Sequence, residues 1–106
     1  MTLRPLGIDP GLCFIGGQWG PVDGGDTIPL RNPSDGSTLC AIARGGAADV
    51  DRAVAAAEGA LSGDWGRMPQ FERGRILQKT GAMVLEHVDE LAELEALDVG
   101  KPLKQA

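Results

Sequence analysis

The sequence predicts an α/β protein, which in this stretch takes an α+β form with two β-hairpins followed by three helices. Glycine and proline gather early, because 10 of the 16 Gly and 5 of the 7 Pro precede residue 47. Eleven of the 15 acidic residues come later, and from Val50 the apolar residues recur at a helical period. Strands and turns are therefore expected in the first part of the chain and helices in the second.

The length of 106 residues allows one domain at most. Surface scaling permits about two-thirds of the unfolded chain's surface to be buried on folding, so the predicted core is thin. Residues 1–12 contain four Pro and Gly residues and show no hydrophobic period. They are predicted to form a flexible N-terminal arm, with regular structure from Cys13 onward.

Two short hairpins are predicted between residues 13 and 43. In the first, Gly16 and Gly17 separate two apolar runs and can adopt the positive φ angles of a type I′ turn. The second pairs residues 27–31 with residues 38–43 around the segment Asn-Pro-Ser-Asp-Gly at positions 32–36. Pro, Asp and Gly each favour a turn for a separate reason, so this segment is expected to connect the strands.

The first predicted helix covers residues 47–62, where small apolar side chains form one face: Val50, Ala53, Val54, Ala57 and Leu61. Such a face allows close packing against a neighbouring element. Acidic residues in the first turn complement the helix dipole. The preceding Gly45-Gly46 pair lacks the third glycine and the spacing of a dinucleotide-binding loop, so it is interpreted as a tight turn from strand to helix.

A second helix is predicted from Pro69, which suits a first helical position. Gly74 and Gly81 lie seven residues apart and therefore almost in line on its apolar stripe. Because each costs about 1 kcal/mol relative to Ala inside a helix, another element is expected to pack against them. A third helix is predicted over residues 88–98 and ends at Gly100, after which Pro102 begins a new element.

Charge and cysteine content limit the partners. A net charge of −5, without a run of Lys or Arg, argues against nucleic acid or an anionic membrane as the main partner. No apolar stretch approaches the roughly 18 residues that a membrane span needs.

Two cysteines 27 positions apart, without a Cys-x-x-Cys motif or a secretory leader, fit a reducing compartment. The protein is therefore expected in the cytoplasm.

Few residues of this stretch suggest catalysis. Cys13 and Cys40 lie in apolar segments without an adjacent base, so they are interpreted as packing residues rather than nucleophiles. His87 is the single imidazole and is interpreted as a solvated residue at a helix junction rather than a general base. One His and two distant Cys do not provide the ligand spacing of a zinc site.

Asp98 is the exception among the acidic residues of the last helix. It follows Leu91 by seven residues and is therefore expected on the same apolar face as Leu91 and Leu94. A carboxylate on a buried face, at the end of a helix where the dipole disfavours negative charge, needs compensation. The candidates are a salt bridge to Lys101, hydrogen bonds from backbone N–H groups of the next segment, and a bound monovalent cation.

Six motifs follow one another after residue 12. They are F-I-G-G-Q-W at 14–19, R-N-P-S-D-G at 31–36, A-D-V-D-R-A-V at 48–54, Trp65, Glu72-Arg73 and L-D-V-G-K-P at 97–102. Together they resemble the N-terminal segment of the NAD(P)-dependent aldehyde dehydrogenase superfamily. The resemblance implies that residues 13–106 are the incomplete N-terminal part of a cofactor-binding domain, on the outside of a Rossmann-like fold.

The resemblance also implies an activity for the complete enzyme. Such enzymes oxidise an aldehyde to a carboxylic acid through a thiohemiacetal on a catalytic Cys, pass hydride to NAD or NADP, and hydrolyse the thioester with a Glu as base. Neither Cys13 nor Cys40 stands in the family's G-Q-x-C context. No catalytic or cofactor-binding residue is therefore assigned to this stretch, which is expected to bind no cofactor alone and to be inactive. The complete enzyme is expected to be a homodimer or homotetramer.

One family site can be carried over. By resemblance, Asp98 and the backbone carbonyls of Arg31 and Leu30 are candidate ligands of a structural monovalent cation. The Ala face of the first helix and the Gly stripe of the second are expected to be docking surfaces, left open in this stretch alone.

Two other interpretations remain open at the level of the sequence. A noncatalytic interaction module derived from such an enzyme would be a cooperative monomer with a closed apolar surface. Alternatively, the 106 residues are the retained part of a longer chain, which an intact mass would decide.

Overall fold

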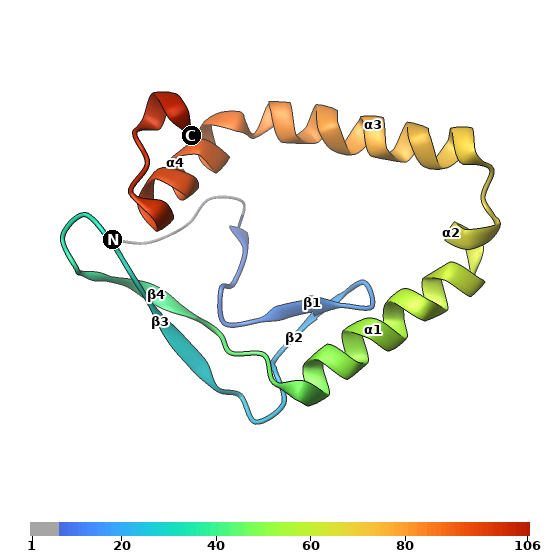
Figure 1. Cartoon of the computed structure of the whole chain (residues 1–106), viewed down its shortest axis with the longest axis horizontal. Coiled ribbons are helices and arrows are strands. Elements are labelled where there is room, and N and C mark those ends of the chain that lie inside the picture. Colours follow the sequence, from blue (N-terminus) through green and yellow to red (C-terminus); the bar gives the residue numbers. More distant parts are fainter. Residues whose placement is uncertain (1–6) are drawn as a thin grey trace.

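The computed structural model describes residues 7–106 (Figure 1). Residues 1–6 of the predicted N-terminal arm lie outside the described residues. The remainder of that arm contains a turn in which the amide of Gly11 donates to the Asp9 carboxylate at 2.8 Å. The carbonyl of Pro10 accepts a hydrogen bond of 2.9 Å from the amide of Ala43, so this segment is attached to the second hairpin.

The first hairpin is formed as predicted by the antiparallel strands β1 (Cys13–Ile15) and β2 (Gln18–Gly20). Gly16 and Gly17 connect them with φ angles of 64° and 79°, which a type I′ turn requires at both central positions. Phe14 lies opposite Trp19 in the register, and their ring centroids are 5.0 Å apart. This aromatic pair is a side-chain contact across the hairpin.

The second hairpin is also confirmed, with β3 at Thr27–Arg31 and β4 at Thr38–Ala43 in a separate two-stranded antiparallel sheet. Asn32 organises the connecting turn. Its amide donates to the Ser37 carbonyl at 2.7 Å, its carbonyl accepts from the Gly36 amide at 2.7 Å, and its side-chain oxygen accepts from the Ser34 amide at 2.9 Å. These bonds explain why a polar residue is buried there.

The helices follow the predicted order, with one addition. They are α1 (Ala47–Ser62), α2 (Asp64–Arg67), α3 (Gln70–Glu86) and α4 (Val88–Val99), followed by the 3₁₀ turn η2 (Leu103–Gln105). The first helix has the predicted bounds. Pro69 is the N-cap of α3 rather than its first helical residue, a difference of one position. Gly100 ends α4 in the left-handed region at φ 72°, as predicted.

Helix α2 was not predicted. Four residues make barely one turn, which is too short for a hydrophobic period to show in the sequence. Contacts with α1 hold it in place, and the Arg73 guanidinium of α3 donates to the carbonyl oxygens of Trp65 and Gly66 at 3.4 and 3.5 Å. Its position therefore depends on its neighbours.

Helix α1 lies along the first hairpin (Figure 1). Alanines 53, 56, 57 and 60 line a hollow opposite the Gly16-Gly17 turn, and a Cβ atom added to Gly16 would lie 3.9 Å from the Ala56 Cβ. The larger members of the predicted apolar face, Val50, Val54 and Leu61, are 52–73% exposed. Ala53 and Ala57 of that face are exposed as well, so no described element buries the predicted face in this chain.

The core is thinner than the length alone suggests. Val22 and Leu39 are the only buried apolar residues among residues 7–106. Helices α1 to α4 form an arch around the two hairpins in Figure 1, and the main contacts of α3 in the described part of the chain are with α4. None of the helices within residues 7–106 combines the length and apolar character that crossing a bilayer requires.

The glycine stripe of α3 is open. A Cβ atom at Gly74 or Gly81 would meet nothing within 4 Å, so no described element packs against either position. We expect Gly74→Ala and Gly81→Ala each to stabilise α3 in this chain by about 1 kcal/mol, since Ala loses less backbone entropy on helix formation. Far-UV circular dichroism on urea titration would measure the gain. A loss of helicity in either variant would contradict the open geometry.

Candidate functional site

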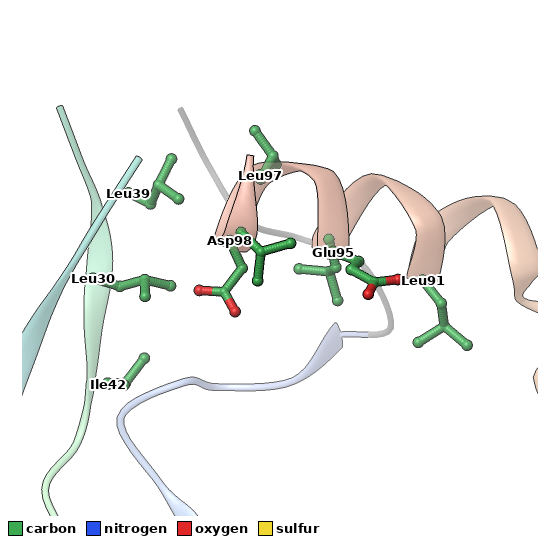
Figure 2. A pocket seen from close by; sticks show the side chains of 9 residues that line it. Leu30, Leu39, Ile42, Leu91, Glu95, Leu97 and Asp98 are labelled. Carbon is green, nitrogen blue, oxygen red and sulfur yellow. The ribbon is translucent and has the colours of Figure 1, made fainter. Parts of the chain in front are cut away.

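A groove separates α4 from the second hairpin, and Asp98 lies on its wall. Leu30, Leu39 and Ile42 line the hairpin side. The α4 side consists of Leu91, Leu94, Glu95, Leu97, Asp98 and Val99. The groove has a volume of about 530 Å³, and its walls are mostly apolar. In Figure 2 the Asp98 carboxylate points from α4 toward the strands that carry Leu30 and Ile42.

The prediction for Asp98 is partly correct. Its side chain lies on the same face as Leu91 and Leu94, but the residue is exposed, because no described element covers the groove. The predicted salt bridge to Lys101 is not formed, since the Lys101 ammonium pairs with Glu95 at 3.3 Å. Within residues 7–106, the Asp98 carboxylate has neither a hydrogen-bond nor an ion-pair partner.

The other two candidate cation ligands are the last two residues of β3. Leu30 lines the groove, and the strand register is irregular between Leu30 and Arg31, which disturbs the ladder of carbonyl pairing locally. The Arg31 guanidinium points away into the turn, where it donates to the Gly36 carbonyl and the Thr38 hydroxyl at 3.4 Å each. A Cβ atom at Gly100 would lie 3.2 Å from the Pro33 ring, so the end of α4 closely approaches this turn.

The three candidate ligands, one carboxylate and two backbone carbonyls, are oxygen donors, which hard cations prefer. A cluster of three or more His, Cys, Asp or Glu side chains that could hold a metal is not found in the described part of the chain. Three oxygen donors fall short of the six or so that such ions commonly take. Any ion here would need further ligands from outside residues 7–106.

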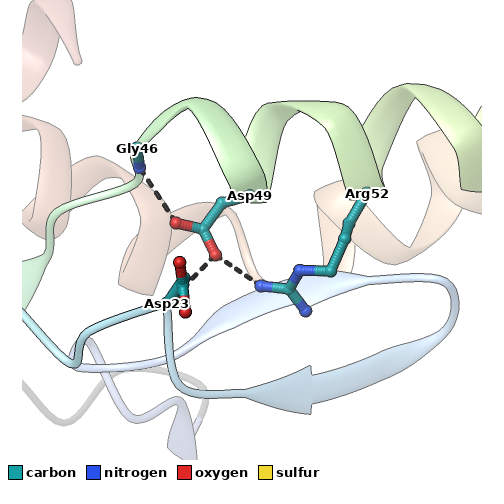
Figure 3. Close-up of polar contacts among 4 residues, drawn as sticks. All are labelled: Asp23, Gly46, Asp49 and Arg52. Atoms are coloured by element: carbon teal, nitrogen blue, oxygen red, sulfur yellow. Dashed lines mark hydrogen bonds and ion pairs between the residues drawn. The ribbon is translucent and has the colours of Figure 1, made fainter.

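The most highly connected carboxylate is Asp49, which the sequence suggested only as a dipole partner. It is 4% exposed, in the first turn of α1 (Figure 3). One oxygen accepts from the Gly46 amide at 2.9 Å, and the other accepts from the Asp23 amide at 2.9 Å and from the Arg52 guanidinium. The side chain thus caps α1 and attaches the loop after β2 to it. The only sequence signal was an acid at the third helical position after Gly46.

These contacts determine the ionisation of Asp49. The amides of Gly46 and Asp23 hold the pKa of the carboxyl below its ordinary value of about 3.8, and the Arg52 side chain lowers the pKa further, while desolvation opposes the shift. Asp49 is therefore charged at neutral pH. A negative group already occupies the N-terminus of α1, so this helix end does not fit the pyrophosphate of a dinucleotide, as the missing third glycine indicates.

The remaining candidates do not assemble into a catalytic site. Cys13 and Cys40 are free, half-buried thiols on β1 and β4. His87 lies at the junction of α3 and α4, where its ring nitrogen is 3.3 Å from the Glu90 carboxylate. No ion pair or hydrogen bond of the described residues brings either cysteine to that imidazole.

Comparisons with known proteins agree with this architecture. The model of the aldehyde dehydrogenase family matches residues 19–106. Human mitochondrial 10-formyltetrahydrofolate dehydrogenase is 48% identical over 92 residues, which are 86% of this chain and 10% of that protein.

Two solved structures show the same fold. The NAD⁺ complex of an aldehyde dehydrogenase from Bacillus cereus is 37% identical with a TM-score of 0.87, over 94% of this chain and 20% of that chain. A point mutant of betaine aldehyde dehydrogenase from Staphylococcus aureus, in complex with NAD⁺, is 29% identical with a TM-score of 0.89. The match covers 99% of this chain and 21% of that chain. The chain thus spans about a fifth of the solved chains and about a tenth of the human protein.

Proposed function

The chain belongs to the aldehyde dehydrogenase family, and from this premise we propose that it is the N-terminal portion of an NAD(P)-dependent enzyme that oxidises an aldehyde to a carboxylic acid. The observation that carries the proposal is the family match over residues 19–106. It is supported by the agreement in fold with NAD⁺-bound aldehyde dehydrogenases over more than nine-tenths of the chain.

We assign these residues a structural role. Residues 13–106 supply the N-terminal part of the cofactor-binding domain, and the catalytic Cys, the general-base Glu and the cofactor loops belong to other parts of the enzyme. The arrangement of Cys13, Cys40 and His87 supports this division, because among the described residues no hydrogen bond or ion pair joins either thiol to the His87 imidazole. A nicotinamide cofactor held by those other parts would supply the hydride acceptor.

Finer features of the proposal concern the whole enzyme. We propose NAD or NADP as the cofactor, a homodimer or homotetramer as the assembly, and the cytoplasm as its location. NAD⁺ in both solved relatives supports the cofactor class. The free thiols of Cys13 and Cys40 support a reducing compartment. The names of the relatives include a formyl-folate and a betaine aldehyde, which are chemically different compounds.

Expression of the complete reading frame that contains these codons tests the proposal. A panel of aliphatic, aromatic and amino aldehydes, each with NAD⁺ or NADP⁺, would be followed by the absorbance of the reduced nicotinamide. We expect aldehyde-dependent reduction that is lost when the Cys of a G-Q-x-C motif is changed to Ala. A reading frame with neither that motif nor a later general-base Glu would contradict the proposal.

The open surface argues against a noncatalytic module that acts by itself. That interpretation requires a closed apolar surface, whereas Phe71, Leu77 and Leu85 of α3 are 63–72% exposed. Exposed apolar side chains on one helix indicate an interface rather than a finished exterior.

We also propose that Asp98, with the carbonyls of Arg31 and Leu30, binds a structural monovalent cation in the complete enzyme. An ion that binds only the folded state at 100 times its Kd stabilises by about 2.7 kcal/mol. We therefore expect Na⁺ or K⁺ to raise the unfolding temperature relative to choline. Asp98→Asn should abolish this difference, and Glu93→Gln on the same helix should preserve it. An equal response to all three salts in the wild type would contradict the site.

A further inference from the structure

Aspartate followed by glycine occurs twice in the chain, at Asp23-Gly24 in the loop after β2 and at Asp35-Gly36 in the turn between β3 and β4. Both pairs are exposed to solvent. This dipeptide can rearrange without an enzyme, because glycine has no side chain to shield its backbone nitrogen from the preceding carboxyl group. The two pairs share the same residues and the same exposure, so the hydrogen bonds around them are what distinguishes them.

The rearrangement begins when the backbone nitrogen of the glycine attacks the Cγ atom of the protonated aspartic acid. A new N–Cγ bond forms, and the proton of the nitrogen leaves with the carboxyl hydroxyl as water. Water then opens the resulting succinimide ring. Attack at the side-chain carbonyl restores aspartate, whereas attack at the main-chain carbonyl breaks the original peptide bond and leaves isoaspartate. Water is lost once and gained once, so no oxidant, reductant or other reactant is needed.

The Asp35-Gly36 pair is restrained by its own turn. The Asp35 Oδ1 atom accepts from the amide and the hydroxyl of Ser37 at 2.9 and 2.7 Å. The Gly36 amide, which would be the nucleophile, donates to the Asn32 carbonyl at 2.7 Å. The bonds from Ser37 also hold the pKa of Asp35 below its ordinary value of about 3.8, so less of the reactive protonated acid is present. Both reacting groups of this pair are therefore engaged elsewhere.

The Asp23-Gly24 pair lacks these restraints. In the described part of the chain, the Gly24 amide donates no hydrogen bond and the Asp23 carboxylate accepts none. A Cβ atom at Gly24 would meet nothing within 4 Å, so the turn has room to change its backbone angles. The turn is closed by a bond of 2.9 Å from the Gly25 amide to the Val22 carbonyl. The Asp23 amide is attached to the Asp49 carboxylate, which leaves the Asp23 side chain unrestrained (Figure 3).

We propose that Asp23-Gly24 is a modification site, at which aspartate converts to isoaspartate through a succinimide while Asp35-Gly36 remains intact. This proposal does not depend on the proposed function, since it rests on the two turns alone. Isoaspartate at position 23 adds one carbon to the main chain inside the turn that is attached to Asp49. The product also carries a free α-carboxylate, which protein isoaspartyl methyltransferases esterify with the methyl group of S-adenosylmethionine.

The test incubates the protein expressed from the complete reading frame in mildly acidic buffer, which raises the fraction of protonated aspartic acid. Trypsin cleaves after Arg31 and Arg44, so the two pairs fall on separate peptides. Chromatography and electron-transfer fragmentation then distinguish isoaspartyl from aspartyl peptides, which have equal mass. We expect isoaspartate to accumulate about tenfold faster or more at position 23 than at position 35, because the second site must first break its hydrogen bonds. In urea, which unfolds both turns, the two rates should agree within about twofold.

Two matched variants assign the methyl acceptor. Asp23→Glu keeps the charge and the amide that binds Asp49, but its longer side chain would have to close a larger ring, which forms more slowly. After incubation, a recombinant isoaspartyl methyltransferase and labelled S-adenosylmethionine should place at least fivefold less label on the peptide that ends at Arg31 than in the wild type. Asp35→Glu should leave the label on that peptide unchanged.

Four results would overturn the proposal. They are equal rates at the two positions in the folded protein, an absence of isoaspartate at position 23 in folded protein when the urea-unfolded protein forms it, undiminished label in Asp23→Glu, and a rate difference that persists in urea. The last result would assign the difference to the neighbouring sequence rather than to the hydrogen bonds. The comparison of the two wild-type peptides needs neither variant, so it decides the proposal even if a variant fails to fold.

Discussion

Replacing Gly66 by Ala should open the junction between α1 and α2. A Cβ atom at this position would overlap the carbonyl oxygen of Leu61 and lie 2.6 Å from its carbonyl carbon, so the backbone must move. Overpacking of this severity costs about 3 kcal/mol or more. The amides of Arg67 and Met68, which donate to Gly63 and Trp65 at 3.2 Å, should lose roughly 100-fold of their hydrogen-exchange protection.

Gly59→Ala provides the matched control for this variant. Gly59 lies inside α1, and a Cβ atom there would meet nothing within 4 Å. The same chemical change should therefore stabilise α1 by about 1 kcal/mol instead of opening it. If Gly66→Ala exchanged like the wild type at Arg67 and Met68, the close approach of α2 to the end of α1 would be refuted.

Asp49→Asn should detach the start of α1 from the loop after β2. The carboxylate uses both oxygens, one for the Gly46 amide and the other for the Asp23 amide and Arg52. An amide side chain has a single acceptor oxygen, so one of the two backbone donors must lose its partner. The exchange protection of Gly46 or Asp23 should fall roughly tenfold or more, because an orphaned donor in a buried place is unfavourable.

The control for Asp49→Asn is Asp51→Asn, which removes the same charge from an exposed position two residues later on α1. We expect this change to have little effect, since only the weak interaction with the helix dipole is lost. Equal losses of protection in the two variants would show that charge, and not the hydrogen bonds of Asp49, stabilises the helix start.

Acid should reproduce the effect of Asp49→Asn in the wild type. The folded-state pKa of Asp49 lies below its ordinary value of about 3.8, so the folded chain binds fewer protons there than the unfolded chain. This contribution to stability is complete above the ordinary pKa and is lost as the pH falls toward the folded-state pKa. The helicity of α1 should fall as the pH drops below the ordinary pKa of about 3.8, by more in the wild type than in Asp49→Asn. If the helicity of the two proteins fell by the same amount on acidification, the lowered pKa of Asp49 would be contradicted.

Local patterns were sufficient to predict most elements. The bounds of β3, β4 and α1 agree with the structure, because turn residues and an apolar period of 3.6 act over a few neighbouring residues. Helix α2 was missed, since four residues show no period. The role of Gly66 was missed for a related reason, because its close approach to Leu61 depends on how α2 folds back on α1.

The candidate site shows the same division. The helical spacing correctly placed Asp98 on the face of Leu91 and Leu94. The family resemblance added the carbonyls of Leu30 and Arg31 as cation ligands, and this assignment stays a proposal. Spacing could not show that this face borders an open groove, or that Lys101 turns to Glu95. The central role of Asp49 was also out of reach, since the Asp23 amide is 26 positions away in the chain.

By itself, the sequence determined the two hairpins, the long helices and the membership of the aldehyde dehydrogenase family, because these depend on short motifs and their order. Only the tertiary structure decided which surfaces are packed and which are open. Burial depends on elements that meet across long separations in the chain, and here it shows an apolar groove and a bare glycine stripe that no described element covers. Free energy favours covering the apolar surface that this stretch leaves exposed.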